Sequence, residues 1–190
     1  FTQRETIYNL CELLTGARFT TSYTRIGGQI RDLPEGFTKQ LSQFCDEFLV
    51  CLDEVDTLLT RNKIFLDRMI DIGCITKESA VAWGMTGPNL RASGVARDLR
   101  KDNPYLGYQN YDFDIPVMDE GDCHARYLVR MEEMRQSIRI CRQVLDRMPD
   151  GPVNLADSKS MLPDKERVMM SMEELIHHFI VSTQGIDAPA

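Results

Sequence analysis

Guanidinium and carboxylate groups gather in one polar stretch, and these are the side chains that could bind a ligand or a partner. Residues 91–108 read RASGVARDLRKDNPYLGY and include Arg91, Arg97, Asp98 and Arg100. The stretch lies between two apolar helical patterns, so we expect its neighbours to bury it in part. A buried guanidinium must pair with a carboxylate, a carbonyl oxygen, an anionic cofactor or a partner. The stretch is therefore either a surface loop with structural ion pairs or a functional site.

A second guanidinium group precedes a pair of glycines. Arg25 is followed by Ile26 and then by Gly27-Gly28, in a segment that we also expect to be partly buried. Asp32 and Asp98 are the obvious internal carboxylate partners for the arginines of the two segments. Two glycines are too few for a phosphate-binding loop, and neither a G-x-G-x-x-G nor a Walker pattern occurs.

Cysteine and histidine spacing gives no sign of a metal site. C-x-x-C pairs, which usually mark zinc and iron–sulfur sites, are absent from the sequence. Cys123 and His124 are adjacent and would not face one ion, and the pair His177-His178 is better explained by a hydrogen-bonded core histidine. No nucleophile with a matching base is evident. The sequence predicts no metal ligand and no catalytic residue in this chain.

Composition narrows the class of protein. The 190 residues carry a formal net charge of -7, which argues against a nucleic-acid binder. Six scattered cysteines are typical of reduced thiols in a core rather than of a disulfide scaffold. No apolar run has the length of a bilayer span, and no signal peptide is evident. Because the chain starts at Phe1 within a helical pattern, we expect it to be an excised internal part of a longer protein.

Hydrophobic periodicity predicts a mostly α fold, a single helical domain over residues 1–190. Alternating steps of four and three between apolar residues indicate two long helices with matching seams, which should pack as in a bundle. A short extended or β segment is expected near 17–33. The predicted helices cover residues 2–14, 35–62, 63–70, 77–85, 121–147 and 171–185, with a loop over 87–116 and a linker up to 163.

Several motifs together resemble one family, the 49-kDa component of respiratory complex I, the NADH:quinone oxidoreductase. They are GARFTTSYTRIGGQIRDLP at 16–34, GMTGPNLRASGVARDLRKDNPYLGY at 84–108, YDFDIPV at 111–117 and SMEELIHHF at 171–179. The resemblance covers nearly the whole chain in the same order. It implies a helical bundle related to the large subunit of [NiFe] hydrogenases, with short β additions.

The resemblance also implies partners and cofactors. The family's subunit packs on an iron–sulfur subunit that carries the terminal cluster, and quinone enters a cavity between the two. The chain itself would bind no cofactor, and it would belong to the peripheral arm at the cytoplasmic face of the bacterial inner membrane. Two alternatives stay open: a large-subunit fragment of a membrane-bound [NiFe] hydrogenase, and a redox-inactive helical interaction module. The isolated chain is expected to be inactive.

Site residues follow from the resemblance position by position. Phe1 matches a phenylalanine that lines the quinone passage, and Arg25 with Gly27 and Gly28 matches a segment near the cluster-bearing partner. Thr20 stands where many relatives have a histidine tied to the pH dependence of the cluster. A hydroxyl takes up no proton near neutral pH, so we expect the reduction potential of the terminal cluster to depend only weakly on pH in this protein. Arg91, Arg97, Asp98 and Arg100 are expected to form a charged seam that faces a neighbouring subunit.

Overall fold

The computed structural model describes residues 2–155 and 161–185, and the chain divides into two compact units. One unit combines Phe1–Phe37 with Pro149–Ala190, and the other is Thr38–Met148. The fold is mostly helical with a short antiparallel hairpin, as the sequence predicted. The single-domain organisation stays a prediction.

The first unit begins with α1 (Thr2–Thr15). Gly16 ends this helix with φ +81, and its N–H donates to the carbonyl of Glu12 at 2.8 Å. The guanidinium of Arg31 donates to the carbonyls of Leu14 and Leu13 at 3.0 and 2.9 Å. A basic side chain thus satisfies carbonyls that a helix end leaves free.

The predicted extended segment is confirmed as a hairpin of β1 (Thr24–Arg25) and β2 (Gly28–Gln29). The strands pair antiparallel, with Arg25 opposite Gly28. The segment 153–155 runs along the other edge of β2: the Gln29 N–H donates to the carbonyl of Val153 at 3.2 Å, and the Leu155 N–H donates to that of Gly27 at 3.0 Å. Segments from the two ends of the chain therefore form one small sheet.

The first unit also contains α8 (Lys165–Met170) and α9 (Met172–Gln184), which contact each other. Ser171 caps α9 by accepting from the Glu174 N–H at 3.5 Å, so the predicted start of this helix is confirmed. The predicted linker ended at 163, and α8 was missed. Its methionines Met169 and Met170 are exposed, so α8 lacks the apolar stripe by which a helix is recognised.

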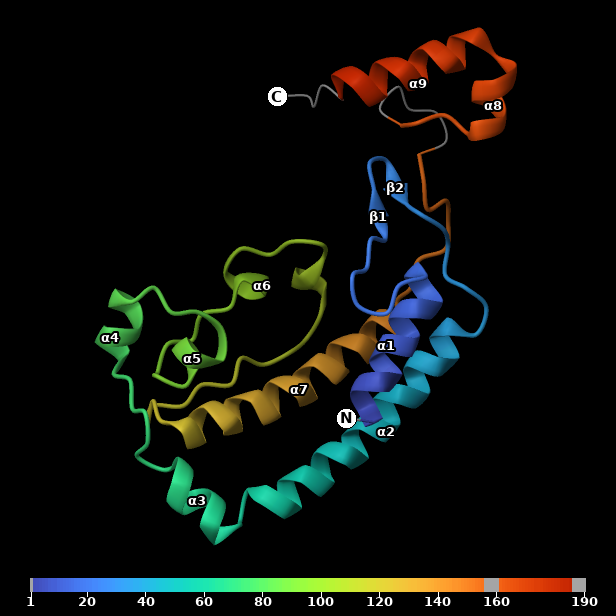
Figure 1. Cartoon of the computed structure of the whole chain (residues 1–190). Coiled ribbons are helices and arrows are strands. Elements are labelled where there is room, and N and C mark those ends of the chain that lie inside the picture. The colour runs from blue at the N-terminus through green and yellow to red at the C-terminus, as the bar shows by residue number, and fades with distance from the viewer. Residues whose placement is uncertain (1, 156–160, 186–190) are drawn as a thin grey trace. The chain divides into compact units, whose positions relative to one another are not determined.

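Two long helices build the second unit, α2 (Phe37–Leu59) and α7 (Cys123–Asp146), close to the predicted ranges. They lie side by side (Figure 1) and are joined by two ion pairs along their length. Asp46 pairs with Arg142 at 2.6 Å and Asp53 with Arg135 at 2.9 Å. The two long helices therefore do pack together, as their matching seams predicted.

Short helices connect α2 to α7. Asn62 caps α3 (Lys63–Met69) and Thr76 caps α4 (Lys77–Ala82), both through side-chain oxygens. The carboxylate of Asp122 caps α7 by accepting from the Ala125 N–H at 2.7 Å, and it also accepts from the Asp71 N–H at 2.9 Å. Within residues 2–155 and 161–185, no helix is long and apolar enough to cross a membrane.

The predicted loop over 87–116 contains α5 (Gly87–Arg91), α6 (Leu99–Asp102) and the 3-10 turn η1 (Tyr108–Asn110). Pro88 presets the first turn of α5, and Asp98 caps α6. Each is too short to show a hydrophobic period, which is why the sequence pattern missed them. Beside α5, Ala92 packs with Ala125 and Val129 of α7 in a buried cluster.

Candidate functional site

The buried centre of the predicted charged seam is Arg91, the last residue of α5. Its Nε donates to Oε1 of Glu133 on α7 at 2.6 Å, and its Nη2 lies 2.5 Å from the same oxygen. Its Nη1 donates to the backbone carbonyl of Arg97 at 2.8 Å and lies 3.9 Å from Oδ2 of Asp98. One guanidinium therefore ties α5, α7 and the segment before α6 together.

The second part of the seam is the bidentate pair of Asp98 and Arg100. Nε and Nη2 of Arg100 donate to the two carboxylate oxygens at 3.0 and 2.6 Å, and the Arg100 N–H donates at 3.0 Å. The hydrogen bond from Arg100 lowers the pKa of Asp98, although burial alone would raise it. The Arg100 guanidinium also lies over the rings of Phe113 and Tyr108, at 4.8 and 5.8 Å from their centroids. The pair is thus fixed on several sides.

The four predicted seam residues are brought together, but they do different things. Arg91, Asp98 and Arg100 form the ion pairs, whereas Arg97 contributes only its carbonyl and extends an exposed side chain. Expected partial burial therefore holds for Arg91 and Arg100 and is wrong for Arg97. Sequence reasoning missed Glu133, because an acidic residue on a long amphipathic helix reads as part of its solvated face.

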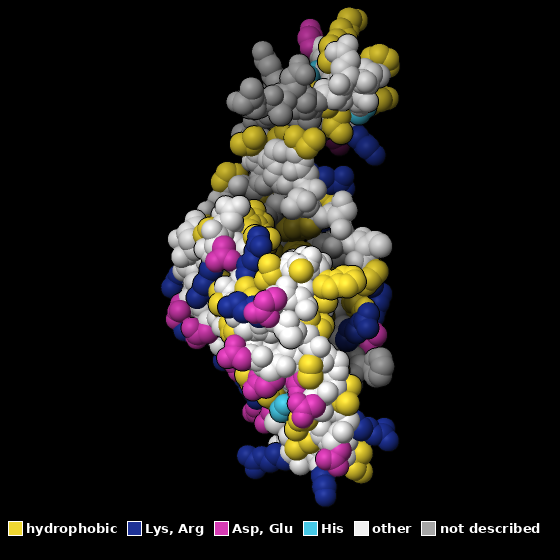
Figure 2. Space-filling model, turned by 90° about the vertical axis from the view of Figure 1, so that its left-hand side faces the viewer, with side chains coloured by type: hydrophobic (Ala, Val, Ile, Leu, Met, Phe, Trp, Pro, Cys, Tyr) yellow, Lys and Arg dark blue, Asp and Glu magenta, His cyan; other side chains and the backbone are white. Residues whose placement is uncertain are grey.

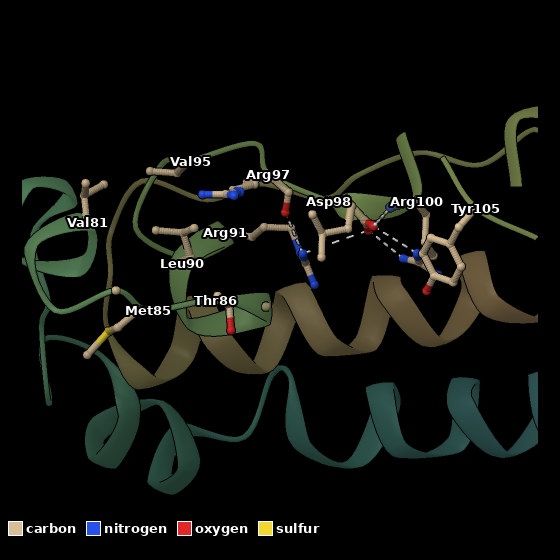
Figure 3. A pocket seen from close by; sticks show the side chains of 13 residues that line it. Val81, Met85, Thr86, Leu90, Arg91, Val95, Arg97, Asp98, Arg100 and Tyr105 are labelled. Carbon is tan, nitrogen blue, oxygen red and sulfur yellow. Dashed lines mark hydrogen bonds and ion pairs between the residues drawn. The ribbon is translucent and has the colours of Figure 1, made fainter. Parts of the chain in front are cut away.

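A cavity of about 470 Å³ opens beside this network (Figure 3). All four seam residues line it, together with Gly84, Thr86 and Gly87. Its apolar lining comes from α4, α5, α6 and the connecting segments: Val81, Met85, Leu90, Val95, Leu99 and Tyr105. A concave, mostly apolar site with a few convergent polar groups is the usual form of a binding pocket.

The other predicted residues lie in the first unit, around the hairpin. Arg25 and Thr20 are exposed, so the expected burial of Arg25 is wrong. Arg25 has no ion-pair partner among the residues the structure describes, and Asp32 bonds instead to the Leu33 N–H at 2.7 Å. Phe1 lies outside the described residues.

Close approach of neighbouring segments explains both glycines of the hairpin. A Cβ on Gly28 would lie 2.2 Å from the carbonyl oxygen of Val153, and one on Gly27 would lie 2.5 Å from Cγ of Met161. Gly27 also has φ +88 in the turn, where glycine is favoured. Gly28 therefore lets segment 153–155 join the hairpin, and Gly27 leaves room for Met161 beside the turn.

The thiols and imidazoles of the described residues do not form a metal-binding cluster. All six cysteines are free; Cys45 is buried and Cys74 is exposed. His177 lies 3.0 Å from the Met161 carbonyl through Nε2, so the expected hydrogen bond is present, but the side chain is only part-buried and does not belong to a core. In the part of the chain that the structure describes, no three His, Cys, Asp or Glu side chains are placed to hold a metal ion.

Comparison with known proteins gives a consistent result. A family model described as the 49-kDa subunit of respiratory-chain NADH dehydrogenase matches residues 1–190. The chain is 57% identical over 190 residues to a NADH-quinone oxidoreductase subunit of Akkermansia muciniphila, covering 100% of this chain and 46% of that protein. It is 60% identical over 189 residues to the subunit of the same name from Methylacidiphilum infernorum, covering 100% and 45%. The chain spans about half the length of the curated relatives it matches.

Proposed function

Since the chain belongs to the family of the 49-kDa subunit of respiratory-chain NADH dehydrogenase, we propose that it works in the quinone-reducing module of NADH:quinone oxidoreductase. The match of the family model to residues 1–190 carries the proposal. In this role the chain binds no cofactor itself. It packs on the iron–sulfur subunit that carries the terminal cluster, in the peripheral arm at the cytoplasmic face of the bacterial inner membrane, and helps to form the quinone cavity.

The hairpin is the surface that we assign to the cluster-bearing partner. Arg25 and Thr20 are exposed there, and a guanidinium without an internal carboxylate is available to pair across an interface. Gly27 and Gly28 permit the packing that fixes the hairpin's backbone, so the position of Arg25 is set by the fold. Phe1 is assigned to the wall of the quinone passage from its place in the sequence.

The charged seam is assigned to contact with another subunit of the complex. Arg91 pairs with Glu133 and Arg100 pairs with Asp98, which holds the segment in place and leaves the exposed side chain of Arg97 for the contact. The seam is therefore a scaffold for an interface rather than a catalytic site.

Purification of the complex through a tag on this chain tests the function. The preparation is expected to oxidise NADH with quinone as acceptor, and to contain iron and a small iron–sulfur subunit without stoichiometric nickel. Stoichiometric nickel would move the assignment to a hydrogenase. Loss of all partners and of the activity would leave only a helical interaction module.

Thr20 makes a sharper test of the assigned surface. A redox titration of the terminal cluster, followed by its paramagnetic signal from pH 6 to pH 8, is expected to give a nearly constant potential. In the Thr20→His variant, an imidazole that gains a proton on reduction is expected to give a slope approaching about 59 mV per pH unit. A slope of that size with threonine in place would contradict the assignment.

A further inference from the structure

We propose that the cavity beside the charged seam receives an apolar side chain of a neighbouring subunit, and that Arg97 pairs with a carboxylate close to that side chain. The proposal rests on the proposed function, which supplies the neighbouring subunit. It adds the place on this chain and the chemistry of the segment that docks there.

The apolar half of the recognition comes from the cavity's lining. Leu90 is buried, while Val81, Leu99 and Tyr105 line the same cavity with half or more of their surface exposed. Exposed apolar side chains that already converge lose contact with water together when an apolar group enters. The volume of about 470 Å³ has room for a large side chain with its neighbours.

The charged part of the recognition comes from Arg97, the seam arginine that takes no part in the ion pairs. Arg91 is satisfied by Glu133, and Arg100 by both oxygens of Asp98. Arg97 has no carboxylate partner among the described residues, and in Figure 3 its side chain extends on the side of Leu90 and Val95, away from the Asp98–Arg100 pair. An occupant that brings a carboxylate to the rim would complement this charge.

The surroundings of the cavity favour a protein over a small amphiphile. Trp83 and Leu106 directly adjoin the lining residues Gly84 and Tyr105 in sequence, and they are 80% and 89% exposed. Figure 2, which views the molecule from the left-hand side of Figure 1, shows hydrophobic side chains lying among both basic and acidic ones. Aromatic residues and arginine are enriched in protein interfaces. A small ligand would fill the cavity and leave Trp83 and Leu106 in water.

Leu106 supplies an independent sign. Its φ is +48, a left-handed conformation that costs a leucine about 1–2 kcal/mol. The backbone thus holds a bulky apolar side chain in solvent in a conformation that leucine disfavours. Such strain is typical of positions that contact a ligand or partner.

Photocrosslinking in the assembled complex tests the proposal. A photoreactive phenylalanine analogue replaces Leu99 at the rim, and a matched control replaces Leu58 on α2, which is 68% exposed and does not line the cavity. The Leu99 site is expected to crosslink to another subunit, at an apolar residue with an Asp or Glu within about three positions. Leu58 is expected not to crosslink to that peptide. Crosslinks only to lipid, only within the chain, or to a peptide without an acidic residue would overturn the proposal.

Charge reversal tests the part played by Arg97. Arg97→Glu is expected to lower the yield of the Leu99 crosslink about tenfold, while Arg97→Lys retains most of it. Changing the partner's acidic residue to lysine is expected to restore the yield with Arg97→Glu. An unchanged crosslink yield in Arg97→Glu would refute the pairing. If that variant fails to assemble, the pairing is judged from the crosslinked peptide found with Arg97 in place, which must contain an acidic residue.

Failure of the proposed function looks different. A tagged chain that purifies without NADH:quinone reductase activity removes the premise. An active complex that lacks the Leu99 crosslink refutes the cavity proposal and leaves the function standing.

Discussion

Removing the acidic partner of the ion pair of Arg91 and Glu133 is expected to destabilise the fold far more than removing the acid of a pair of the same length at the surface. The side chains of Arg91 and Glu133 are 10% and 19% exposed, with a shortest nitrogen–oxygen distance of 2.5 Å. Asp46 and Arg142 pair at 2.6 Å with side chains 69% and 48% exposed. The shortest nitrogen–oxygen distances are therefore matched, whereas the burial of the two pairs differs.

Replacement of each acid by its amide isolates the charge. Removing one partner of a buried pair typically costs about 3–5 kcal/mol. Glu133→Gln should cost less, about 2 kcal/mol, because the amide oxygen still accepts from Arg91, and because Asp98 and the Arg97 carbonyl remain. Asp46→Asn should cost about 0.3 kcal/mol, as exposed pairs do.

Urea denaturation at pH 7, followed by circular dichroism, gives both free energies of unfolding. Hydrogen exchange of the α7 amides reports whether the loss falls in the second unit, where both pairs lie. A difference between the two variants of less than about 0.5 kcal/mol would refute the claim that burial decides the contribution.

Three further predictions use the same chain. Asp98 has a lowered pKa in the folded chain, so its ionised form stabilises the fold at pH values above its unfolded pKa of about 3.9, and this stabilisation is lost as the pH falls through the folded pKa. The difference in free energy of unfolding between Asp98→Asn and the unchanged chain should therefore shrink below about pH 4, which urea titrations at several pH values would measure. Gly28→Ala should separate segment 153–155 from the hairpin, because the new Cβ would lie 2.2 Å from a backbone oxygen. Amide hydrogen exchange at Gln29 and Leu155 should therefore become much faster. The control Gly16→Ala should have a smaller effect, because the space around Gly16 is open and only its positive φ costs about 1 kcal/mol. Arg97→Ala should weaken assembly of the complex, measured by co-purification, while the melting temperature of the isolated chain changes little; the reverse result would make the role structural.

The long elements could be predicted because their signals are local and repeated. Apolar residues at steps of four and three identify α2 and α7 over many turns, and Ser171 and Thr76 are recognisable caps. By contrast, α5, α6 and α8 have four to six residues each, fewer than two turns, so no period can appear.

The sequence could predict which residues belong to the candidate site, but not what each of them does. The arginines of residues 91–100 were found from charge between apolar patterns, yet which of them is buried depends on Glu133, more than thirty residues away in the chain. Sequence spacing cannot show which acid on α7 faces α5. Arg25 was expected to be buried for the same kind of reason, and its exposure reflects a hairpin whose partner segment, 153–155, comes from the other end of the chain.

The carboxylate of Asp122 couples the start of α7 to the closure of the chain between Asp71 and Asp122. Burial alone would raise its pKa, but hydrogen bonds from the Ala125 and Asp71 N–H groups, together with the neighbouring His124 and Arg126, lower the pKa below its usual value. One of these bonds starts α7, whereas the other closes a loop of 51 residues. Fraying of the first turn of α7 therefore also releases the Asp71 segment, and closing the loop restores the helix start. Local opening of this region should occur as one cooperative step rather than two.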